Sequence, residues 1–277
     1  DIVILNFFEN CILKKWPILH LTKAFFILVL LKVVVRKIIW IRHNYYPHDY
    51  KKEEHSTYYG VICDLLYRFS TDILAHRPVP ELGIMEYVPH PQYYCYSNSC
   101  DSTKHNTQLS FLYFGQVKSY KGLTQLLNAW PSDYHLRMLG KSDSELLTLE
   151  IKKIISDRNL NVTWENAFVE KKVLNDIILQ SDYVIIPHID DSMIVTGAAY
   201  HAISLGCNVI LNESNFAKWF KSEYPFASNY DRTSLMQTLS KCVKTNRKDI
   251  LDFVANKNGD IVLMSSWEYF FNKTSVN

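Results

Sequence analysis

Short apolar runs alternate along the chain with longer segments in which apolar residues recur every third or fourth position. The short runs predict buried strands, and the longer segments predict amphipathic helices. The predicted strands are Ile2 to Leu5, Lys37 to Arg42, Leu109 to Phe114, His135 to Leu139, Asn161 to Trp164, Tyr183 to Ile186 and Asn208 to Leu211. The predicted helices include Leu123 to Trp130, Ser144 to Arg158, Lys171 to Gln180 and Ala198 to Leu205. This alternation predicts an α/β fold with parallel sheets and helical crossovers.

A polar, turn-rich stretch near the middle of the chain predicts a boundary between two lobes. Residues 93–107 read YYCYSNSCDSTKHNT, a composition typical of a linker. We therefore predict one α/β lobe over residues 1–104, a second over residues 105–255, and a C-terminal helix within residues 256–277 that packs back on the first lobe. The chain opens directly on a strand, so we expect the first lobe to be incomplete at its start.

Composition narrows the classes of protein further. With 48% hydrophobic residues the chain can bury two cores, and 30 basic against 28 acidic side chains are too balanced for binding held by nucleic-acid phosphates. The six cysteines include no CxxC pair, which indicates neither a zinc site nor a disulfide framework. We expect a reducing, cytoplasmic compartment.

The most apolar stretch covers residues 24–35, AFFILVLLKVVV. It is shorter than the roughly 20 residues that a membrane-spanning helix needs and it contains Lys32, so we expect it to be buried in the core. Basic residues lie among the apolar ones in this region, and they form either a face for anionic lipid or a solvated helix edge. These basic residues are Lys14, Lys15, Lys23, Lys32, Arg36 and Lys37.

Two loops of the second lobe follow predicted strands, which is where parallel α/β sheets bind ligands. In the first loop, GQVKSYKG at residues 115–122, Gly115 would let a ligand approach the backbone and Lys121 would contact a phosphate. Taken alone, a plain strand-to-helix turn explains this loop slightly better, because the GxxxxGK[ST] pattern of a phosphate-binding loop is missing.

The second loop precedes a helix of small residues. Ser192, Thr196 and the Gly197 amide would hold a second phosphate at the helix N-terminus, where free N–H groups and a partial positive charge are available. The alternative is a buried crossover helix with Thr196 as its N-cap, and both can hold together. Two such sites in one lobe indicate a pyrophosphate ligand. Glu170, ahead of another helix, could contact ligand, although a role at the helix dipole is favoured.

In the first lobe, two histidines and a carboxylate follow a predicted strand. Residues 40–49 read WIRHNYYPHD, and His43, His48 and Asp49 can supply proton transfer or hydrogen bonds to sugar. A polar loop in which His43 caps backbone groups accounts for this segment equally well. The VPHP sequence at residues 88–91 is better explained as a rigid turn.

Several motifs taken in order resemble those of bacterial glycosyltransferases of the GT-B fold related to family 4. They are HNYYPHD, VPHPQYY, FLYFGQVKSYKGLTQLLNAW, LRMLGK, FVEKKVLNDIILQSDYVIIPHIDD and VTGAAYHAISLGCNVI. More narrowly, the chain is similar to a branch from capsule, exopolysaccharide and O-antigen clusters with the motifs HNxxPHE, FGxxRxYKG and TSGxxxxALSxGxPVI. The likeness runs from about Asp1 to Trp267, and it is specific through the order and spacing of the motifs together.

The resemblance implies two Rossmann-like lobes with a cleft between them, the first binding acceptor and the second binding a nucleotide sugar. The candidate donor-binding residues are Gly115, Gln116, Lys121, Gly122, Glu170, Ser192, Thr196 and Gly197. The candidate catalytic residues, which would face the transferred sugar or the acceptor, are His43, His48 and Asp49.

The chain departs from the family pattern at three positions. Gln116 stands where the family has an arginine, so one charge contact to the diphosphate is missing. The family's two glutamates, eight positions apart, correspond here to Met193 and His201, which leaves the ribose and sugar contacts unassigned. Retention and inversion both stay open. Asp49 or His48 would act as base in an inverting enzyme, whereas His43 would only hydrogen-bond the sugar in a retaining one.

From these features we expect a hexosyltransferase that needs neither a metal nor a cofactor beyond its UDP- or GDP-sugar donor. Its acceptor would be a lipid-linked oligosaccharide or polysaccharide in surface polysaccharide biosynthesis, reached from the inner face of the cytoplasmic membrane. We expect no nucleic-acid partner and no metal site. A nucleotide-sugar epimerase of the same fold and a catalytically inactive nucleotide-sugar-binding scaffold are the alternatives.

Overall fold

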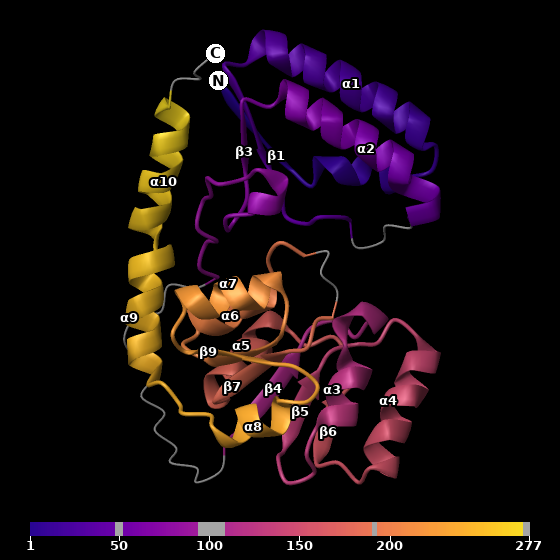
Figure 1. The fold of residues 1–277 in the computed structure, drawn as a ribbon, viewed down its shortest axis with the longest axis vertical. Helices are drawn as coiled ribbons and strands as arrows, with labels where there is room; N and C mark the ends of the chain where they lie inside the picture. The colour runs from indigo at the N-terminus through magenta and orange to yellow at the C-terminus, as the bar shows by residue number, and fades with distance from the viewer. Residues whose placement is uncertain (48–51, 94–108, 190–192, 274–277) are drawn as a thin grey trace. The chain divides into compact units, whose positions relative to one another are not determined.

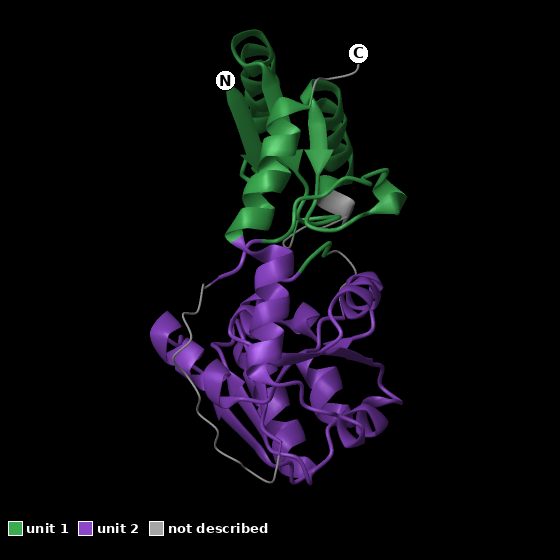
Figure 2. Ribbon diagram, turned by 90° about the vertical axis from the view of Figure 1, so that its left-hand side faces the viewer, with its two compact units in different colours: residues 1–90, 192–195, 260–277 green, residues 91–191, 196–259 purple. Residues whose placement is uncertain are grey.

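The computed structural model describes residues 1–47, 52–93, 109–189 and 193–273. It divides into two compact units, shown in green and purple in Figure 2. Unit 1 comprises Asp1–His90, Ser192–Val195 and Asp260–Asn277, and unit 2 comprises Pro91–Asp191 and Thr196–Gly259. Each unit holds a parallel sheet with helices packed on it, so the predicted fold class of two Rossmann-like α/β lobes is confirmed.

Unit 1 is built on a three-stranded parallel sheet covered on both faces. Its strands lie in the order β1 (Ile2–Asn6), β2 (Lys37–Ile41) and β3 (Asp72–Leu74). Helices α1 (Pro17–Val34) and α2 (Lys52–Phe69) pack with the 3-10 helix η1 (Phe8–Leu13) on one face, and α10 (Asp260–Asn272) packs on the other (Figure 1). All five residues of β2 are buried, as expected for a central strand covered on both sides.

Lys37 connects this sheet to α10 and is not a surface residue, which corrects its predicted place on a basic face. Its ammonium group donates to the carbonyl of Phe270 at 2.5 Å and to that of Lys273. Asp72 lies 3.8 Å from the same nitrogen. The buried charge is therefore compensated by an ion pair and by carbonyl groups at the end of α10.

Helix α1 contradicts the expectation that the apolar stretch is buried. Its 18 residues have a mean hydropathy of 1.9, yet only 11% of that window is buried within the described structure. Ala24 and Leu28 are the two buried residues of the helix. By length and composition it is the one helix among the described residues that could cross a membrane.

Unit 2 is built on a six-stranded parallel sheet in the order β6-β5-β4-β7-β8-β9. The strands are β4 (Phe111–Phe114), β5 (Leu136–Leu139), β6 (Val162–Glu165), β7 (Tyr183–Ile186), β8 (Asn208–Asn212) and β9 (Ala227–Tyr230). Five of them were predicted to within two residues at each end. The sequence missed β9, which reads ASNY, and it also missed β3 of unit 1, which has only three residues.

Helices cover both faces of this sheet. Helices α3 (Leu123–Ala129), α4 (Glu145–Asp157) and α8 (Leu235–Ser240) share one core with Phe111, Tyr113 and other residues that face the same way. On the opposite face Phe114 packs against His201 of α6 (Gly197–Ser204). Helices α5 (Lys171–Gln180), α7 (Asn215–Glu223) and α9 (Arg247–Asn258) contact α6 (Figure 1). The alternation of Tyr113 and Phe114 is the period of two expected for a strand.

The carboxyl ends of β4 and β5 approach so closely that a side chain does not fit between them. Gly140 has φ 147°, and a Cβ on it would lie 1.9 Å from the carbonyl oxygen of Gly115. The Gly115 amide meanwhile donates to Leu139 O at 3.0 Å. Glycine at position 140 is thus needed both for its backbone conformation and for the close approach.

We predict that Gly140→Ala lowers the free energy of unfolding by about 3 kcal/mol or more, because it adds both backbone strain and a backbone clash. The matched control is Gly60→Ala in α2, where a Cβ would meet nothing within 4 Å. That change should raise stability by about 0.5–1 kcal/mol, since glycine is a poor helix former. Urea unfolding, followed through the fluorescence of Trp164, whose indole N–H donates to Gly140 O, measures both. Equal effects of the two substitutions would contradict the close approach.

Candidate functional site

The sheet of unit 2 has its topological switch point between β4 and β7. From β4 the chain runs outward through β5 and β6, and it then returns to the other side of β4 for β7, β8 and β9. The loops after β4 and β7 therefore leave neighbouring strands in opposite directions. Ligands of open α/β sheets bind at this place. These are the two loops that the sequence singled out as phosphate sites.

The two loops are in contact. A Cβ on Gly122, which has φ 69°, would lie 2.1 Å from the carbonyl oxygen of Pro187 and 2.7 Å from the Ile189 side chain. The Ile189 amide also donates to Tyr120 O at 3.4 Å. Gly122 therefore lets the loop after β7 lie against the turn that carries Lys121. The structure brings together the two loops that the sequence could only place separately.

Lys121 is the predicted phosphate-binding residue of this site. It ends the 3-10 turn η3 (Ser119–Lys121), and its ammonium lies 5.4 Å from the centre of the Tyr120 ring. Burial, followed by the charge of the neighbouring Lys118, lowers the pKa of Lys121 to about 8. Desolvation and a like charge both make the protonated form costly, and a bound anion would relieve both effects. The site is thus poised to gain from binding an anion.

Gly115 and Gln116 directly follow β4 and are exposed. Gly115 has φ 119°, a conformation that favours glycine. The Gln116 carbonyl accepts a hydrogen bond from the Tyr113 hydroxyl at 3.1 Å. Both residues keep their predicted place at the start of the loop.

The N-terminus of α6 begins at Gly197, with the buried Thr196 as N-cap. Thr196 therefore occupies the N-cap position of a buried helix, as the alternative interpretation expected, but its side chain makes no capping hydrogen bond. Tyr93 lies directly against this helix end, because a Cβ on Gly197 would be 2.5 Å from the Tyr93 hydroxyl oxygen. Gly197 therefore has a packing role that the sequence did not predict, beside any contact of its amide with a ligand.

The two positions that replace the family's glutamates make local contacts. His201 Nε2 lies 2.9 Å from Asn175 Oδ1 of α5, and its ring stacks on Tyr93 with centroids 5.1 Å apart. Burial, followed by the charge of Lys171, lowers the pKa of His201 to about 4, so it is neutral at neutral pH. Met193 pairs with Asn44 in an antiparallel bridge. No carboxylate stands at either position.

Two further candidate donor-binding residues are Glu170 and Ser192. Glu170 is exposed at the N-cap of α5 and makes no side-chain capping bond. It lies at the carboxyl edge of the sheet, since α5 follows β6. Ser192 lies outside the described residues, as does the Asp190-Asp191 pair.

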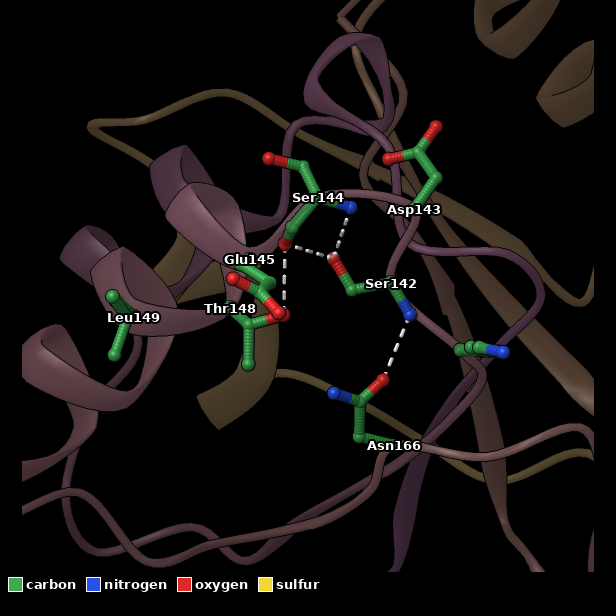
Figure 3. A pocket seen from close by; sticks show the side chains of 8 residues that line it. Ser142, Asp143, Ser144, Glu145, Thr148, Leu149 and Asn166 are labelled. Atoms are coloured by element: carbon green, nitrogen blue, oxygen red, sulfur yellow. Dashed lines mark hydrogen bonds between the residues drawn. The ribbon is translucent and has the colours of Figure 1, made fainter.

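A hollow of about 350 Å³ lies at the same edge, beyond β5 and β6 (Figure 3). Ser142 at its base donates its amide to Asn166 Oδ1 at 2.8 Å, and its hydroxyl donates to Ser144 O at 2.9 Å. Asp143 on its rim lies 3.9 Å from Lys118 of the loop after β4. The sequence analysis missed this hollow, although the GKSDSE sequence after a predicted strand marks the place. Its hydrogen-bonding groups are largely occupied locally, and we assign no ligand to it.

In unit 1, three histidine rings form a chain near the carboxyl ends of the strands. The rings of His43 and His76 have centroids 5.3 Å apart, and those of His76 and His90 are 4.9 Å apart. Phe7, which follows β1, stacks on His43 with centroids 4.1 Å apart. Phe7 has φ 52°, a left-handed conformation that is unusual for a bulky residue. Such outliers concentrate at functional sites.

Hydrogen bonds indicate which nitrogen carries the proton in two of these rings, His43 and His76. His43 Nε2 donates to Asn6 Oδ1 at 2.9 Å, and His76 Nδ1 donates to Val88 O at 3.0 Å. Burial, followed by the charges of His76 and His90, lowers the pKa of His43 to about 4. Burial also lowers the pKa of His76. Each neutral ring retains one nitrogen lone pair, which suits hydroxyl groups better than phosphate.

His43 is the one predicted catalytic residue that the structure describes, because His48 and Asp49 lie outside the described residues. The sequence analysis missed its neighbours Asn6 and His76. Asn6 carried a signal, since it comes directly after the predicted strand Ile2 to Leu5, whereas the strand before His76 was not predicted. His90 had been explained as part of a rigid turn, and the structure places it in the histidine chain.

The segment before Thr196 joins unit 1. Ile194 is fully buried there, its amide donates to His43 O at 3.3 Å, and its carbonyl accepts from Arg77 Nε at 2.7 Å. Arg77 is itself buried. The chain thus fixes the His43 backbone with residues that lie far away in sequence.

Across the described ranges, no group of three or more His, Cys, Asp and Glu residues is arranged to hold a metal ion.

Comparison with known proteins shows the fold. No family model matches the sequence, and no curated protein matches it. Among solved structures, a glycosyltransferase from Rickettsia africae matches with TM-score 0.67 at 14% identity, covering 99% of this chain and 78% of that one. HepE from Anabaena in complex with UDP-glucose matches with TM-score 0.66 at 11% identity, covering 91% and 77%. Sucrose-phosphate synthase from Thermosynechococcus elongatus matches with TM-score 0.65 at 13% identity, covering 90% and 71%.

These structural matches show the fold, the two-lobe Rossmann-like fold of GT-B glycosyltransferases. At such low sequence identities they show nothing more. The sequence resemblance is confirmed to that extent. The narrower branch, with its capsule, exopolysaccharide and O-antigen members, stays a prediction.

We predict that His43 titrates with a pKa near 4 rather than 6.5, measured by NMR of its ring protons against a His43→Gln spectrum. The folded protein then binds this proton more weakly than the unfolded chain. The stability that His43 contributes is therefore present above pH 6.5 and is lost as the pH falls toward 4.

Melting temperatures across that window should fall less steeply in His43→Gln than in wild type. His76→Gln should raise the pKa of His43, because it removes a ring whose protonated form repels a proton on His43. A His43 midpoint near 6.5 would contradict the buried histidine chain.

Proposed function

We propose that this protein is a GT-B glycosyltransferase that moves a sugar from a nucleoside diphosphate sugar to a saccharide acceptor. The observation that carries the proposal is the contact between the loops after β4 and β7, which sets the turn that carries Lys121 against Pro187 and Ile189 at the switch point of unit 2. The fold supports it, since HepE of the same fold was solved with UDP and with UDP-glucose. We infer UDP as the first candidate nucleotide.

Lys121 would stabilise the leaving group. When the bond between sugar and diphosphate breaks, negative charge builds on the diphosphate, and a positive group fixed in a partly desolvated loop lowers the energy of that state. The amide of Gly197 would add a donor at the start of α6. Since Gln116 provides no charge, Lys121 would carry most of this effect. We propose that fixed protein groups do this work without a divalent metal.

The histidine chain of unit 1 would bind sugar hydroxyls. His43 and His76 are neutral at neutral pH, and each offers a lone pair to a hydroxyl donor. A neutral cluster favours an uncharged saccharide over a phosphate. We propose that the acceptor is a lipid-linked oligosaccharide or polysaccharide of a surface polysaccharide pathway, used at the cytoplasmic face of the membrane. The choice between inversion and retention depends on His48 and Asp49 and is open to product analysis by NMR.

We predict that UDP raises the melting temperature of the protein by a few degrees at about a hundred times its dissociation constant, which corresponds to roughly 2.7 kcal/mol. Lys121→Ala should weaken UDP binding about tenfold or more, because it removes a charge-assisted contact. Lys218→Ala, at an exposed lysine paired with Glu213, is the matched control and should change nothing.

The same site predicts a pH dependence. Lys121 loses its proton above pH 8, so UDP affinity should fall by up to about tenfold per pH unit above that value. Lys121→Arg should keep its affinity at pH 9, because arginine stays charged. A pH-independent affinity in the wild type, or no shift with any nucleoside diphosphate, would remove Lys121 from the donor site.

We predict that transfer proceeds in EDTA and depends on the acceptor. The assay follows UDP release from UDP-sugars with and without a lipid-linked saccharide. A strict Mg²⁺ requirement would contradict charge stabilisation by protein groups alone. Donor turnover without acceptor would indicate an epimerase or a hydrolase. Binding without turnover under any condition would indicate a scaffold, a role for which the absence of carboxylates at Met193 and His201 leaves room.

A further inference from the structure

Helix α1 presents an apolar face where a helix on the surface of a soluble domain has a polar one. Four large apolar residues lie on the side away from its buried Ala24 and Leu28, at the spacing of one helix face. They are Leu19 (51% exposed), Phe26 (64%), Leu30 (61%) and Val33 (80%). A helix that is apolar all round is normally enclosed in a core or in a membrane, and this one is enclosed on one side only.

The polar groups on this face are already satisfied or charged. Thr22 belongs to it, and its hydroxyl donates to Ile18 O at 3.0 Å within the helix. Trp16, which is 74% exposed, caps the start of the helix beside Lys14 and Lys15. An indole next to lysines at the end of an apolar helix is typical of residues at the level of lipid headgroups.

The charged side chains of α1 and of the segments that flank it in sequence all have one sign. Between Asn10 and His48 the sequence has no Asp or Glu, while five basic side chains on or beside α1 are exposed. These are Lys14, Lys15, Lys23, Lys32 and Arg36. A second copy docked on the same face would bring these like charges together, which costs free energy. An anionic bilayer complements them and also accepts the apolar side chains.

The packing of α1 in unit 1 favours an arrangement along the membrane surface over a spanning one. Eighteen residues make a helix about 27 Å long, slightly short of a typical hydrocarbon core. One side of α1 also packs on α2 and η1 through Leu28 and its neighbours. The helix can therefore lie along the membrane surface with Phe26 and Leu30 in the acyl region, and Lys23 can extend its aliphatic stem toward the headgroups.

We propose that the outward face of α1 docks unit 1 on an anionic lipid bilayer by inserting its apolar side chains, with the surrounding lysines selecting anionic headgroups. Such docking would give access to a lipid-linked acceptor, and in this respect the inference rests on the proposed function. It goes beyond a basic face held by electrostatics alone, because it predicts a component of binding that high salt does not remove.

Vesicle co-sedimentation of the whole chain tests this, with phosphatidylcholine vesicles containing or lacking phosphatidylglycerol, at low and high salt. The triple variant Leu19→Gln/Phe26→Gln/Leu30→Gln should lower the partition coefficient about tenfold or more at both salt concentrations. The variant Lys14→Gln/Lys15→Gln/Lys23→Gln should lower binding to the anionic vesicles by up to about 100-fold at low salt, and should not change binding to the neutral vesicles.

The matched control is Leu146→Gln/Met236→Gln/Val243→Gln, which changes exposed apolar residues of unit 2. It should leave vesicle binding unchanged. A second readout is quenching of tryptophan fluorescence by brominated lipid, which Trp16→Phe should reduce while the buried Trp40 and Trp130 stay unquenched.

Three results would overturn the proposal. They are wild type that stays in the supernatant with anionic vesicles, equal loss of binding in the control variant, and a wild-type dimer that the α1 variant dissociates without any effect on vesicles. The UDP-induced thermal shift, measured on the same variants, shows that they are folded and separates the two proposals. Vesicle binding without nucleotide binding would remove the proposed function alone, and nucleotide binding without vesicle binding would remove the docking face alone.

Discussion

The close approach of backbone segments at the carboxyl edge of unit 2 is the constraint on which the rest of the site depends. Gly140 meets the Gly115 carbonyl, and Gly122 meets the Pro187 carbonyl, at separations that leave no room for a Cβ. These contacts bring the loop after β4 against the loops after β5 and β7. Lys121 is held there in partial burial, with its pKa lowered to about 8. This packing disfavours the charged ammonium group, and a bound anion would offset that cost.

In unit 1, burial lowers the pKa of two histidines. Burial favours the neutral forms of His43 and His76, and hydrogen bonds to Asn6 and to the Val88 carbonyl fix which nitrogen of each ring carries the proton. A neutral cluster and a cationic loop suit different ligands, hydroxyls in one unit and phosphates in the other. On the far side of the same small sheet from α10, helix α1 leaves its apolar face outward. Each unit thus has one feature that costs free energy without a partner. A bound anion would stabilise the charge of Lys121 in unit 2, and a lipid surface would cover the apolar face of α1 in unit 1.

The sequence predicts most of the framework and part of the site. Strands and helices with clear periodicity were placed well, and Lys121 and His43 were proposed because each lies in a loop that follows an apolar strand. His76 was missed because β3 has three residues and gives no periodic signal. Lys37 was placed on the surface because its partners, Asp72 and the carbonyl groups beyond α10, are distant in sequence. The burial predicted for α1 was wrong for another reason, since an apolar helix has the same composition in a core as at a lipid surface.

The central claim is that a nucleoside diphosphate binds where the loops after β4 and β7 meet. Hydrogen exchange of the backbone amides, compared with and without UDP, tests it most directly because it locates the ligand on the chain. The account predicts slower exchange in residues 115–122 and at the start of α6, with β1 and α1 of unit 1 unaffected. Protection confined to other segments, or none at saturating UDP, would contradict it.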